Sequence, residues 1–432
     1  MPNWPFLHNG NPIHISRAEG VFLYTKDGRQ ILDGAGGAIV CNIGHGRAEV
    51  ADVVREATLK ADYILPPWSC DEREELVELL TSKWLRPSFT RIHLTCGGSE
   101  AIESAMRIAV MHFAAQGNEK KVKIIGRDVS YHGTTLATIS VGGHESRKVG
   151  IKHMLQRYPV APTPYTLRCE DPDPTQHYLD ELEQTILQEG PDTVAALLAE
   201  PIAGASGGAM VPPDGYWEGV REMCDRYNMV LIVDEIMTGF GRTGTRFGYQ
   251  HWPIEPDIFV SGKGLTAGYS PLNGLFSTDE IAEPIEQSAG YSVMFHTYGS
   301  FAPACAAATK VLQIMEREGL VDRAKELGSL LRAKLQAAFS NHPHVAECRG
   351  KGLLQAIEIV KNRATLERYP AVENVTGRVI QKSFENGVHF YGAGNSIVRD
   401  VVLLGPPMTV DESHLDTMVS ALSDAVDSVT EA

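Results

Sequence analysis

The sequence predicts an α/β fold, in which helices cover both faces of a mostly parallel central sheet and a smaller α+β domain follows. Two observations carry this prediction. Between residues 99 and 262, short apolar runs alternate with stretches of helical periodicity, which is typical of a parallel sheet covered by helices. After about residue 305 the pattern changes to long helices and short strands. We therefore expect a hairpin arm over 1–45, a large domain over 46–305 and a small domain over 306–432.

The spacing of apolar residues predicts the helices and strands along the chain. Apolar residues that recur every three or four positions predict helices at 99–115, 177–190 and 215–228. Runs of apolar residues, several of them β-branched, predict buried strands at 121–127, 193–201, 229–235 and 256–262. In the last third, we expect two helices over 304–339 that meet near Gly319, a strand at 353–360 and an amphipathic helix at 412–426.

Composition excludes several functional classes. The chain has 432 residues, 43% of them hydrophobic and 22% charged, with a formal net charge of −15. An acidic body of this size repels phosphate backbones, so nucleic-acid binding is not expected. The seven scattered cysteines form no CxxC pair, which argues against a disulfide framework and against a metal site. No signal-peptide core or membrane-spanning run is present, and we expect a cytoplasmic protein.

Three chemically useful side chains follow predicted strands: Glu200, Asp234 and Lys263. Ligands bind at the carboxyl ends of parallel strands. A lysine in a dry pocket has a lowered pKa and can attack an aldehyde, and a fixed carboxylate would keep a pyridine nitrogen protonated. Taken singly, an exposed turn lysine is the more common interpretation of Lys263, and a helix cap or ion pair is as good an interpretation of Asp234.

Two further segments suit a planar, phosphorylated ligand. Gly97 and Gly98 precede a predicted helix that opens at Ser99, and free N–H groups at such a start favour phosphate. Tyr131 and His132, in "SYHGTT", could present a flat ring for stacking. An ordinary helix cap and a structural turn are the alternative interpretations.

The segment 239–244, "GFGRTG", matches the dinucleotide-binding fingerprint letter for letter. The mechanism of that fingerprint requires a helix directly after the glycines. The residues that follow, "TRFGYQHWPIEP", have no helical period. A nucleotide site is therefore not favoured.

Together these stretches resemble the class III aminotransferases of the pyridoxal-phosphate-dependent type I fold. The similarity rests on "CGGSEAIESAMRIA", "YHG", "LIVDEIMTGFGRTG", "DIFVSGKGLTAGYSPL", "HTYGSFAPACAAA" and "VVLLGPPM", and it extends over nearly the whole chain. The resemblance implies an aminotransferase that binds pyridoxal 5'-phosphate in its large domain. It also implies a homodimer with shared active sites.

The resemblance assigns roles to single residues. Lys263 would be the Schiff-base lysine and proton shuttle, and Asp234 would hold the pyridine nitrogen. Gly98 and Ser99 would bind the phosphate, Tyr131 and Ile236 would pack on the two faces of the ring, and Thr297 would reach the phosphate of the partner subunit. His132 and Glu200 would line the pocket.

This chain departs from the family pattern at Met237, and also at Phe301 and Ala302, which stand where His-Pro is common. Met237 stands where many members have glutamine, which favours the branch that uses amines or ω-amino acids as donors and an oxo acid, pyruvate, as acceptor. Arg399 is the candidate for holding the acceptor carboxylate, and a solvated loop arginine is the alternative. An aminomutase, decarboxylase or lyase of the same fold, a nucleotide-dependent oxidoreductase and a non-catalytic binding protein remain alternative functions.

Overall fold

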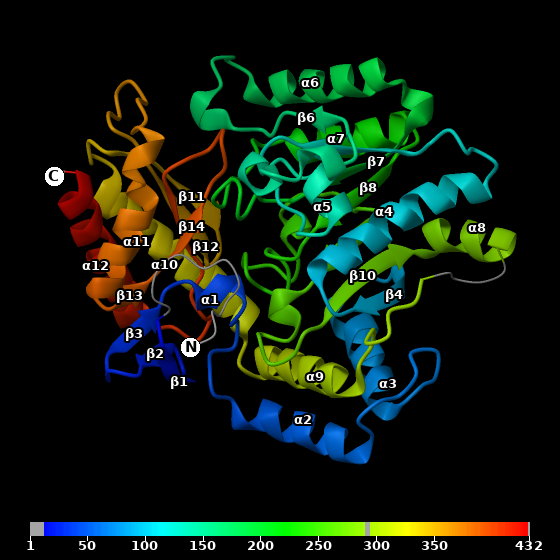
Figure 1. The fold of residues 1–432 in the computed structure, drawn as a ribbon, viewed down its shortest axis with the longest axis horizontal. Helices are drawn as coiled ribbons and strands as arrows, with labels where there is room; N and C mark the ends of the chain where they lie inside the picture. Colours follow the sequence, from blue (N-terminus) through cyan, green and yellow to red (C-terminus); the bar gives the residue numbers. More distant parts are fainter. Residues whose placement is uncertain (1–12, 290–293, 431–432) are drawn as a thin grey trace.

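The centre of the molecule is a seven-stranded sheet with the order β4-β10-β9-β8-β7-β5-β6 (Figure 1). The computed structural model describes residues 13–289 and 294–430. Strands β6, β5, β7, β8 and β9 run parallel, and β10 is antiparallel to both of its neighbours. The mostly parallel sheet is therefore confirmed, and β10 was not predicted. The strands are β4 (Phe89–Thr95), β5 (Lys123–Arg127), β6 (Val160–Ala161), β7 (Val194–Ala199), β8 (Val230–Asp234), β9 (Ile258–Ser261) and β10 (Asn273–Thr278).

Helices cover both faces of this sheet. Leu231 and Ile232 are neighbours in β8 and belong to two different apolar clusters, one on each face. Burial on both sides explains why the central strands are continuous apolar runs. The helices on one face are α4 (Gly98–Ala115), α5 (Leu136–Val141) and α8 (Asp279–Ala289), and those on the other are α6 (Pro174–Glu189) and α7 (Tyr216–Arg226).

A separate four-stranded sheet, β11-β12-β15-β14, lies in the C-terminal third beside three helices (Figure 1). Its strands are β11 (Val345–Lys351), β12 (Leu354–Ile359), β14 (Tyr391–Ala393) and β15 (Val401–Leu404), and the helices are α10 (Leu320–Phe339), α11 (Val375–Glu385) and α12 (Glu412–Thr430). Gly319, with φ of 59°, separates α10 from α9 (Ala302–Arg317) as expected. The predicted domain boundary at residue 305 falls inside α9, which packs on α2 (Ala48–Lys60) and α3 (Asp71–Leu79).

The N-terminal arm is built into a third sheet with the order β1-β2-β3-β13. The arm supplies β1 (Ile15–Glu19), β2 (Phe22–Thr25) and β3 (Gln30–Asp33), and the C-terminal third supplies β13 (Val388–His389). Because β3 and β13 pair in parallel, the arm lies against the C-terminal third, as the blue and orange ribbons of Figure 1 show.

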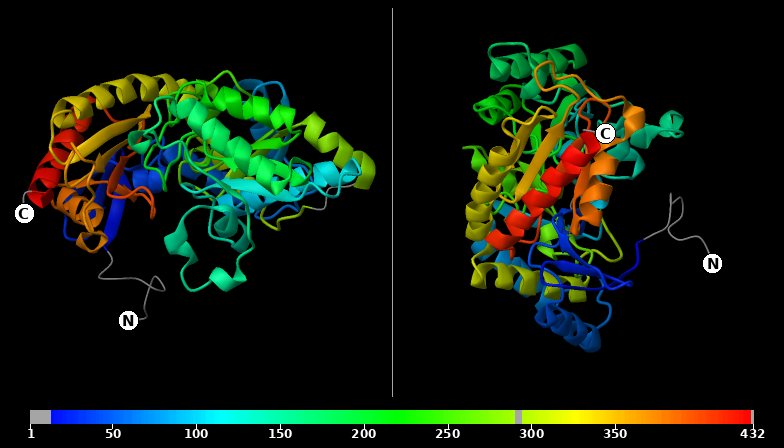
Figure 2. Two further views of the ribbon diagram at one scale, coloured as in Figure 1. Left: turned by 90° about the horizontal axis from the view of Figure 1, so that it is seen from above. Right: turned by 90° about the vertical axis from the view of Figure 1, so that its left-hand side faces the viewer.

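The remaining helical segments are short. They are α1 (Gly36–Ile39), η1 (Leu80–Trp84), η2 (Glu145–Lys148), η3 (Lys152–Met154), η4 (Thr166–Arg168), η5 (Pro191–Thr193), η6 (Gly248–His251), η7 (Lys263–Leu265) and η8 (Ala371–Glu373). Segments η2 and η3 belong to a lobe that projects from the body of the molecule, teal in the left view of Figure 2. Over the described ranges, no helix combines the length and apolar character that crossing a membrane requires.

Candidate active site

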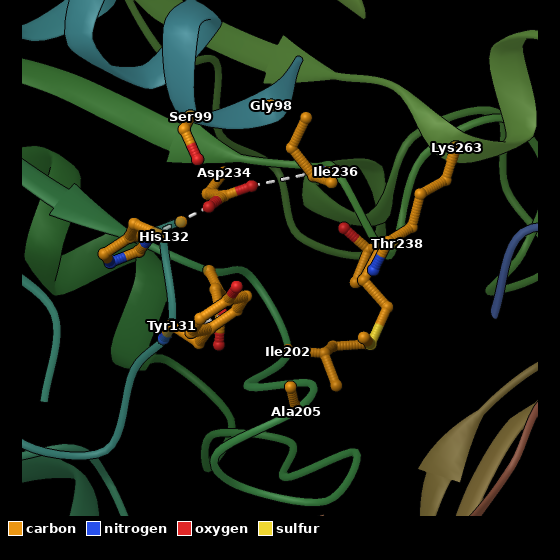
Figure 3. Close-up of a pocket in the computed structure, with 13 residues that line it drawn as sticks. Gly98, Ser99, Tyr131, His132, Ile202, Ala205, Asp234, Ile236, Thr238 and Lys263 are labelled. Carbon is orange, nitrogen blue, oxygen red and sulfur yellow. Dashed lines mark hydrogen bonds and ion pairs between the residues drawn. The ribbon is translucent and has the colours of Figure 1, made fainter. Parts of the chain in front are cut away.

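Three neighbouring parallel strands, β7, β8 and β9, deliver Glu200, Asp234 and Lys263 to one edge of the central sheet. Asp234 ends β8, whereas Glu200 and Lys263 follow β7 and β9 within two residues. All three side chains line one pocket, with about 630 Å³ of empty space when its open mouth is included. Figure 3 shows Asp234 and Lys263 approaching this pocket from different sides. The sequence placed these groups at one edge, and the structure brings them together.

The Asp234 carboxylate is buried, and two groups compensate its charge. Its Oδ1 accepts a hydrogen bond from the Ile236 backbone N–H at 3.0 Å. Its Oδ2 lies 2.7 Å from Nδ1 of His132, whose side chain is fully buried. These contacts hold the carboxylate in one orientation and reduce the cost of burying it.

The other ring nitrogen of His132, Nε2, is buried and has no hydrogen-bond partner within residues 13–289 and 294–430. Sequence reasoning placed His132 in the pocket without recognising it as the partner of Asp234. The signal for that role is spatial, because the two residues lie far apart in the chain.

Lys263 begins the short helix η7 with φ of 42°, a left-handed conformation that is unusual for a residue other than glycine. Burial lowers the pKa of its ammonium group, the charges of Asp234 and Glu200 oppose that effect, and Arg242 adds to it. A lowered lysine pKa increases the fraction of the neutral amine, which is the nucleophilic form.

Glu200 is almost completely buried, and burial raises the pKa of its carboxyl group to about 7; the neighbouring His132 opposes this rise and the charge of Asp234 adds to it. Its oxygens accept hydrogen bonds from the backbone N–H groups of Gly204 at 3.1 Å and Tyr131 at 3.4 Å. The group therefore changes protonation state near neutral pH.

The start of α4 forms the upper wall of the pocket in Figure 3. The Glu100 carboxylate turns back and accepts from the N–H groups of Cys96 and Gly97, while Gly98 and Ser99 face the pocket. Ser99 Oγ accepts from the Thr134 N–H at 3.0 Å. Gly133 has φ of 140°, and a Cβ there would lie 2.2 Å from Ser99 Oγ. Glycine at 133 is therefore what lets Ser99 occupy its place.

Tyr131 and Ile236 approach the pocket from different sides (Figure 3). Five further residues line it and were not predicted as site residues, and most of them follow the carboxyl ends of β7 and β8: Gly133, Ile202, Ala205, Met237 and Thr238. The position of these loops after buried strands was the sequence signal available for them.

Thr297 and Arg399 lie outside this pocket. Thr297 is exposed, and its carbonyl oxygen accepts a hydrogen bond from the Tyr63 hydroxyl at 3.1 Å. The Arg399 guanidinium donates to the backbone carbonyl of Tyr369 at 3.0 Å. Their proposed roles therefore need a partner subunit for Thr297 and a different side-chain conformation for Arg399.

The fingerprint-like segment 239–244 has a structural role. No helix directly follows its glycines, and the next helical segment is the short η6. Arg242 is fully buried and donates to the carbonyls of Leu353 and Pro406 and to Asn42. The loop thus ties the large sheet to the arm and the C-terminal third.

The pocket fits the cofactor that the resemblance implies. Free N–H groups at the start of α4 suit a phosphate, Tyr131 and Ile236 suit the faces of a flat ring, and Asp234 suits a protonated ring nitrogen. One buried polar atom of a pocket residue, Nε2 of His132, has no protein partner in the described residues, which fits a site that binds a polar ligand.

Known proteins are similar to this chain over nearly its whole length. The sequence model of the family "Aminotransferase class-III" matches residues 7–426. A diaminobutyrate–2-oxoglutarate transaminase of Halomonas elongata is 33% identical, over 99% of this chain and 93% of its own. A taurine–pyruvate aminotransferase of Bilophila wadsworthia is 33% identical, over 98% and 93%. A solved omega-transaminase of Pseudomonas jessenii in complex with PMP superposes with a TM-score of 0.92 at 30% identity, over 99% and 96%.

Proposed function

Because this chain belongs to the class III aminotransferases, which are pyridoxal-phosphate-dependent transaminases, we propose that it moves an amino group from an amine or ω-amino acid to pyruvate. The observation that carries the proposal is the convergence of Lys263, Asp234 and the start of α4 in one pocket. The relatives include both a pyruvate enzyme and a 2-oxoglutarate enzyme. Met237 and the absence of an arginine among the residues lining the pocket support the branch that uses amine donors.

Some of the pocket residues would bind the cofactor, and Lys263 would also transfer a proton. Gly98, Ser99 and the N–H groups of α4 would hold the phosphate, and Tyr131 and Ile236 would enclose the ring. Asp234, oriented by His132, would keep the ring nitrogen protonated. Bound pyridoxal phosphate supplies an electron sink for charge that develops at the substrate carbon. Lys263 would anchor the cofactor. Once the amine of the donor has taken the place of Lys263, the freed lysine amine would move a proton at the substrate carbon.

A homodimer is part of the proposal. Thr297 is exposed and lies outside the pocket of its own subunit, which fits a contact with a partner's cofactor. Exposed aromatic side chains lie in the same region, among them Tyr63 and Tyr298, whose rings are 6.1 Å apart. Such residues are enriched at interfaces between subunits. The cytoplasm remains the expected compartment.

The visible spectrum of the purified protein tests this function. We expect a yellow protein whose absorption band is absent in Lys263→Ala, bleaches with one class of amine and returns with pyruvate. The conservative variant Lys263→Arg keeps the charge and is expected to lose the band as well, because the band depends on the amine. A colourless protein that takes up no pyridoxal phosphate would contradict the proposal. A yellow protein that no donor bleaches would instead favour a decarboxylase, lyase or aminomutase.

A further inference from the structure

Three side chains of the kinds that bind metal ions meet in the loop that leads from β3 through α1 to α2 (Figure 1). They are the carboxylate of Asp33, the thiol of Cys41 and the imidazole of His45. One donor atom of each lies within 4.8 Å of the donor atoms of the other two. The group lies outside the pocket that contains Lys263, and it offers one oxygen, one sulfur and one nitrogen to the same point.

The carboxylate of Asp33 has a fixed orientation. It is fully buried, and its Oδ1 and Oδ2 accept hydrogen bonds from the Gly37 N–H at 3.0 and 2.9 Å. Its Oδ2 also lies 2.9 Å from Nε2 of His45. Backbone donors that orient a carboxylate in this way are typical of the surroundings of metal ligands. An ion would therefore meet a carboxylate that needs little reorganisation.

The backbone of the loop also fixes Cys41 and His45. The Cys41 N–H donates to the Gly36 carbonyl at 3.1 Å, and His45 exchanges two backbone hydrogen bonds with Gly20. Three residues separate Cys41 from His45, which is within the range found between zinc ligands. Both side chains are partly exposed, so an ion can enter from the solvent.

The distances between the donor atoms suit a tetrahedral zinc site. Zn²⁺ lies about 2.0 Å from oxygen and nitrogen ligands and about 2.3 Å from sulfur, so its tetrahedral ligand atoms lie about 3.3 to 3.5 Å apart. The distance of 2.9 Å between Asp33 Oδ2 and His45 Nε2 needs to widen only slightly to reach this range. The metal then takes the place of the proton that joins the two side chains.

We propose that Asp33, Cys41 and His45 bind one zinc ion and leave the fourth position to a water molecule. A set that mixes sulfur, nitrogen and oxygen favours zinc over magnesium or calcium, which prefer oxygen ligands throughout. The lack of a CxxC pair in the sequence does not bear on this site, because only one of its ligands is a cysteine. The site is structural, and it takes no part in amino transfer.

A zinc ion at this position stabilises contacts between the arm and the large sheet. A Cβ placed on Gly268, in the segment that follows Lys263, would lie 3.7 Å from Sγ of Cys41. Asn42, the residue after Cys41, donates from Nδ2 to the Phe240 carbonyl at 2.8 Å. The loop that holds the ion thus packs against two segments that follow strands β8 and β9.

The test is a calorimetric titration of the purified, chelator-treated holoenzyme with zinc chloride. We expect one equivalent of zinc to bind in the wild-type protein. In Cys41→Ser we expect the dissociation constant to rise by about 100-fold or more, because the loss of a ligand costs more than the loss of a residue that only orients one, which costs about 10- to 100-fold. Serine has nearly the size of cysteine and leaves the pair of Asp33 and His45 intact.

Two further variants control the measurement. Cys70 is also a partly exposed free cysteine and is not part of the group, so Cys70→Ser is the matched control and should leave the dissociation constant unchanged. His45→Asn keeps the thiol of Cys41 and should weaken zinc binding by a factor similar to that of Cys41→Ser. The thermal unfolding midpoint of each variant without zinc shows whether it is folded.

Cobalt reports the identity of the ligands. Co²⁺ replaces zinc in tetrahedral sites and then absorbs visible light strongly, at longer wavelengths than the cofactor. We expect these bands in the wild-type protein and in Cys70→Ser, and we expect Cys41→Ser to lack them.

Three results would overturn the proposal. They are a wild-type protein that binds no zinc, zinc binding that persists unchanged in folded Cys41→Ser, and displacement of the zinc by excess Mg²⁺, which would indicate a site made of oxygen ligands. In each case Asp33 and His45 form only an ion pair, and Cys41 is an unligated thiol.

Discussion

At the scale of single residues, the pocket holds several ionisable side chains away from bulk water. Asp234, Glu200 and Lys263 are carried there by strands that the apolar core holds rigidly, and each adjusts to the low polarity in its own way. His132 compensates Asp234, Lys263 has a lowered pKa and Glu200 has a raised one. Groups whose pKa values are moved in opposite directions are typical of sites that transfer protons.

Glu200 makes the stability of the cofactor-free protein depend on pH. The raised pKa means that the folded state binds the proton of Glu200 more tightly than the unfolded state does. Its contribution is therefore complete below the ordinary carboxyl pKa and is lost as the pH rises through about 7. Glu200→Gln imitates the neutral acid. We expect it to unfold at a higher temperature than wild type at pH 8, by the equivalent of up to about 3 kcal/mol, and at nearly the same temperature at pH 4.

The midpoint of thermal unfolding at the two pH values measures this effect. Glu119→Gln, a change to an exposed carboxyl group outside the pocket, serves as the control and should shift neither midpoint. If Glu200→Gln stabilised the protein equally at both pH values, the pKa of Glu200 would not be raised in the folded state.

At the scale of elements, the site depends on how loops leave strands and enter helices. The start of α4 offers Gly98 and Ser99 to the pocket only because the turn that contains Gly133 passes against Ser99 without a side chain. The start of α4 and the turn at Gly133 are separate in sequence but pack against each other. Only a glycine at position 133 leaves room for the Ser99 side chain to face the pocket.

We expect Gly133→Ala to weaken cofactor binding. The new Cβ would overlap Ser99 Oγ and force the start of α4 away, which should raise the dissociation constant of pyridoxal phosphate about 10- to 100-fold. Gly117→Ala is the matched control, because Gly117 also has a positive φ, of 81°, but faces open space. Titration of the cofactor-free variants with pyridoxal phosphate measures both constants, and equal affinities would contradict this account.

The sequence predicted the elements whose signal is local. The buried strands ending in Asp234 and preceding Lys263, the glycine between α9 and α10, and the lack of a helix after the fingerprint-like glycines follow from periodicity and turn chemistry. The pairing of His132 with Asp234, the anchoring by Arg242 and the antiparallel β10 depend on contacts between distant segments. No single-sequence pattern reports such contacts, so these features required the structure.

At the scale of the whole molecule, the role proposed for Thr297 would make activity depend on assembly. The residue is exposed in one subunit and outside its pocket. If it completes the phosphate site of a partner, each active site combines Lys263 from one chain with Thr297 from the other.

A mixed dimer tests this arrangement. Co-expression of Lys263→Ala and Thr297→Ala chains with different affinity tags yields heterodimers with one site that carries both changes and one that carries neither. At limiting pyridoxal phosphate we expect these heterodimers to have about half of the wild-type activity, while both parent homodimers are nearly inactive. Activity no higher than that of the parents would mean that both residues serve the same subunit's site.

The pairing of β3 with β13 means that the first sheet of the protein can be completed only late in translation. The strand near residue 32 leaves the ribosome early, whereas its partner near residue 388 is translated almost last. At ordinary elongation rates the arm therefore waits roughly tens of seconds with an unpaired strand edge. The nascent chain must shield that edge, and a message truncated before β13 would release a product whose first sheet can never close.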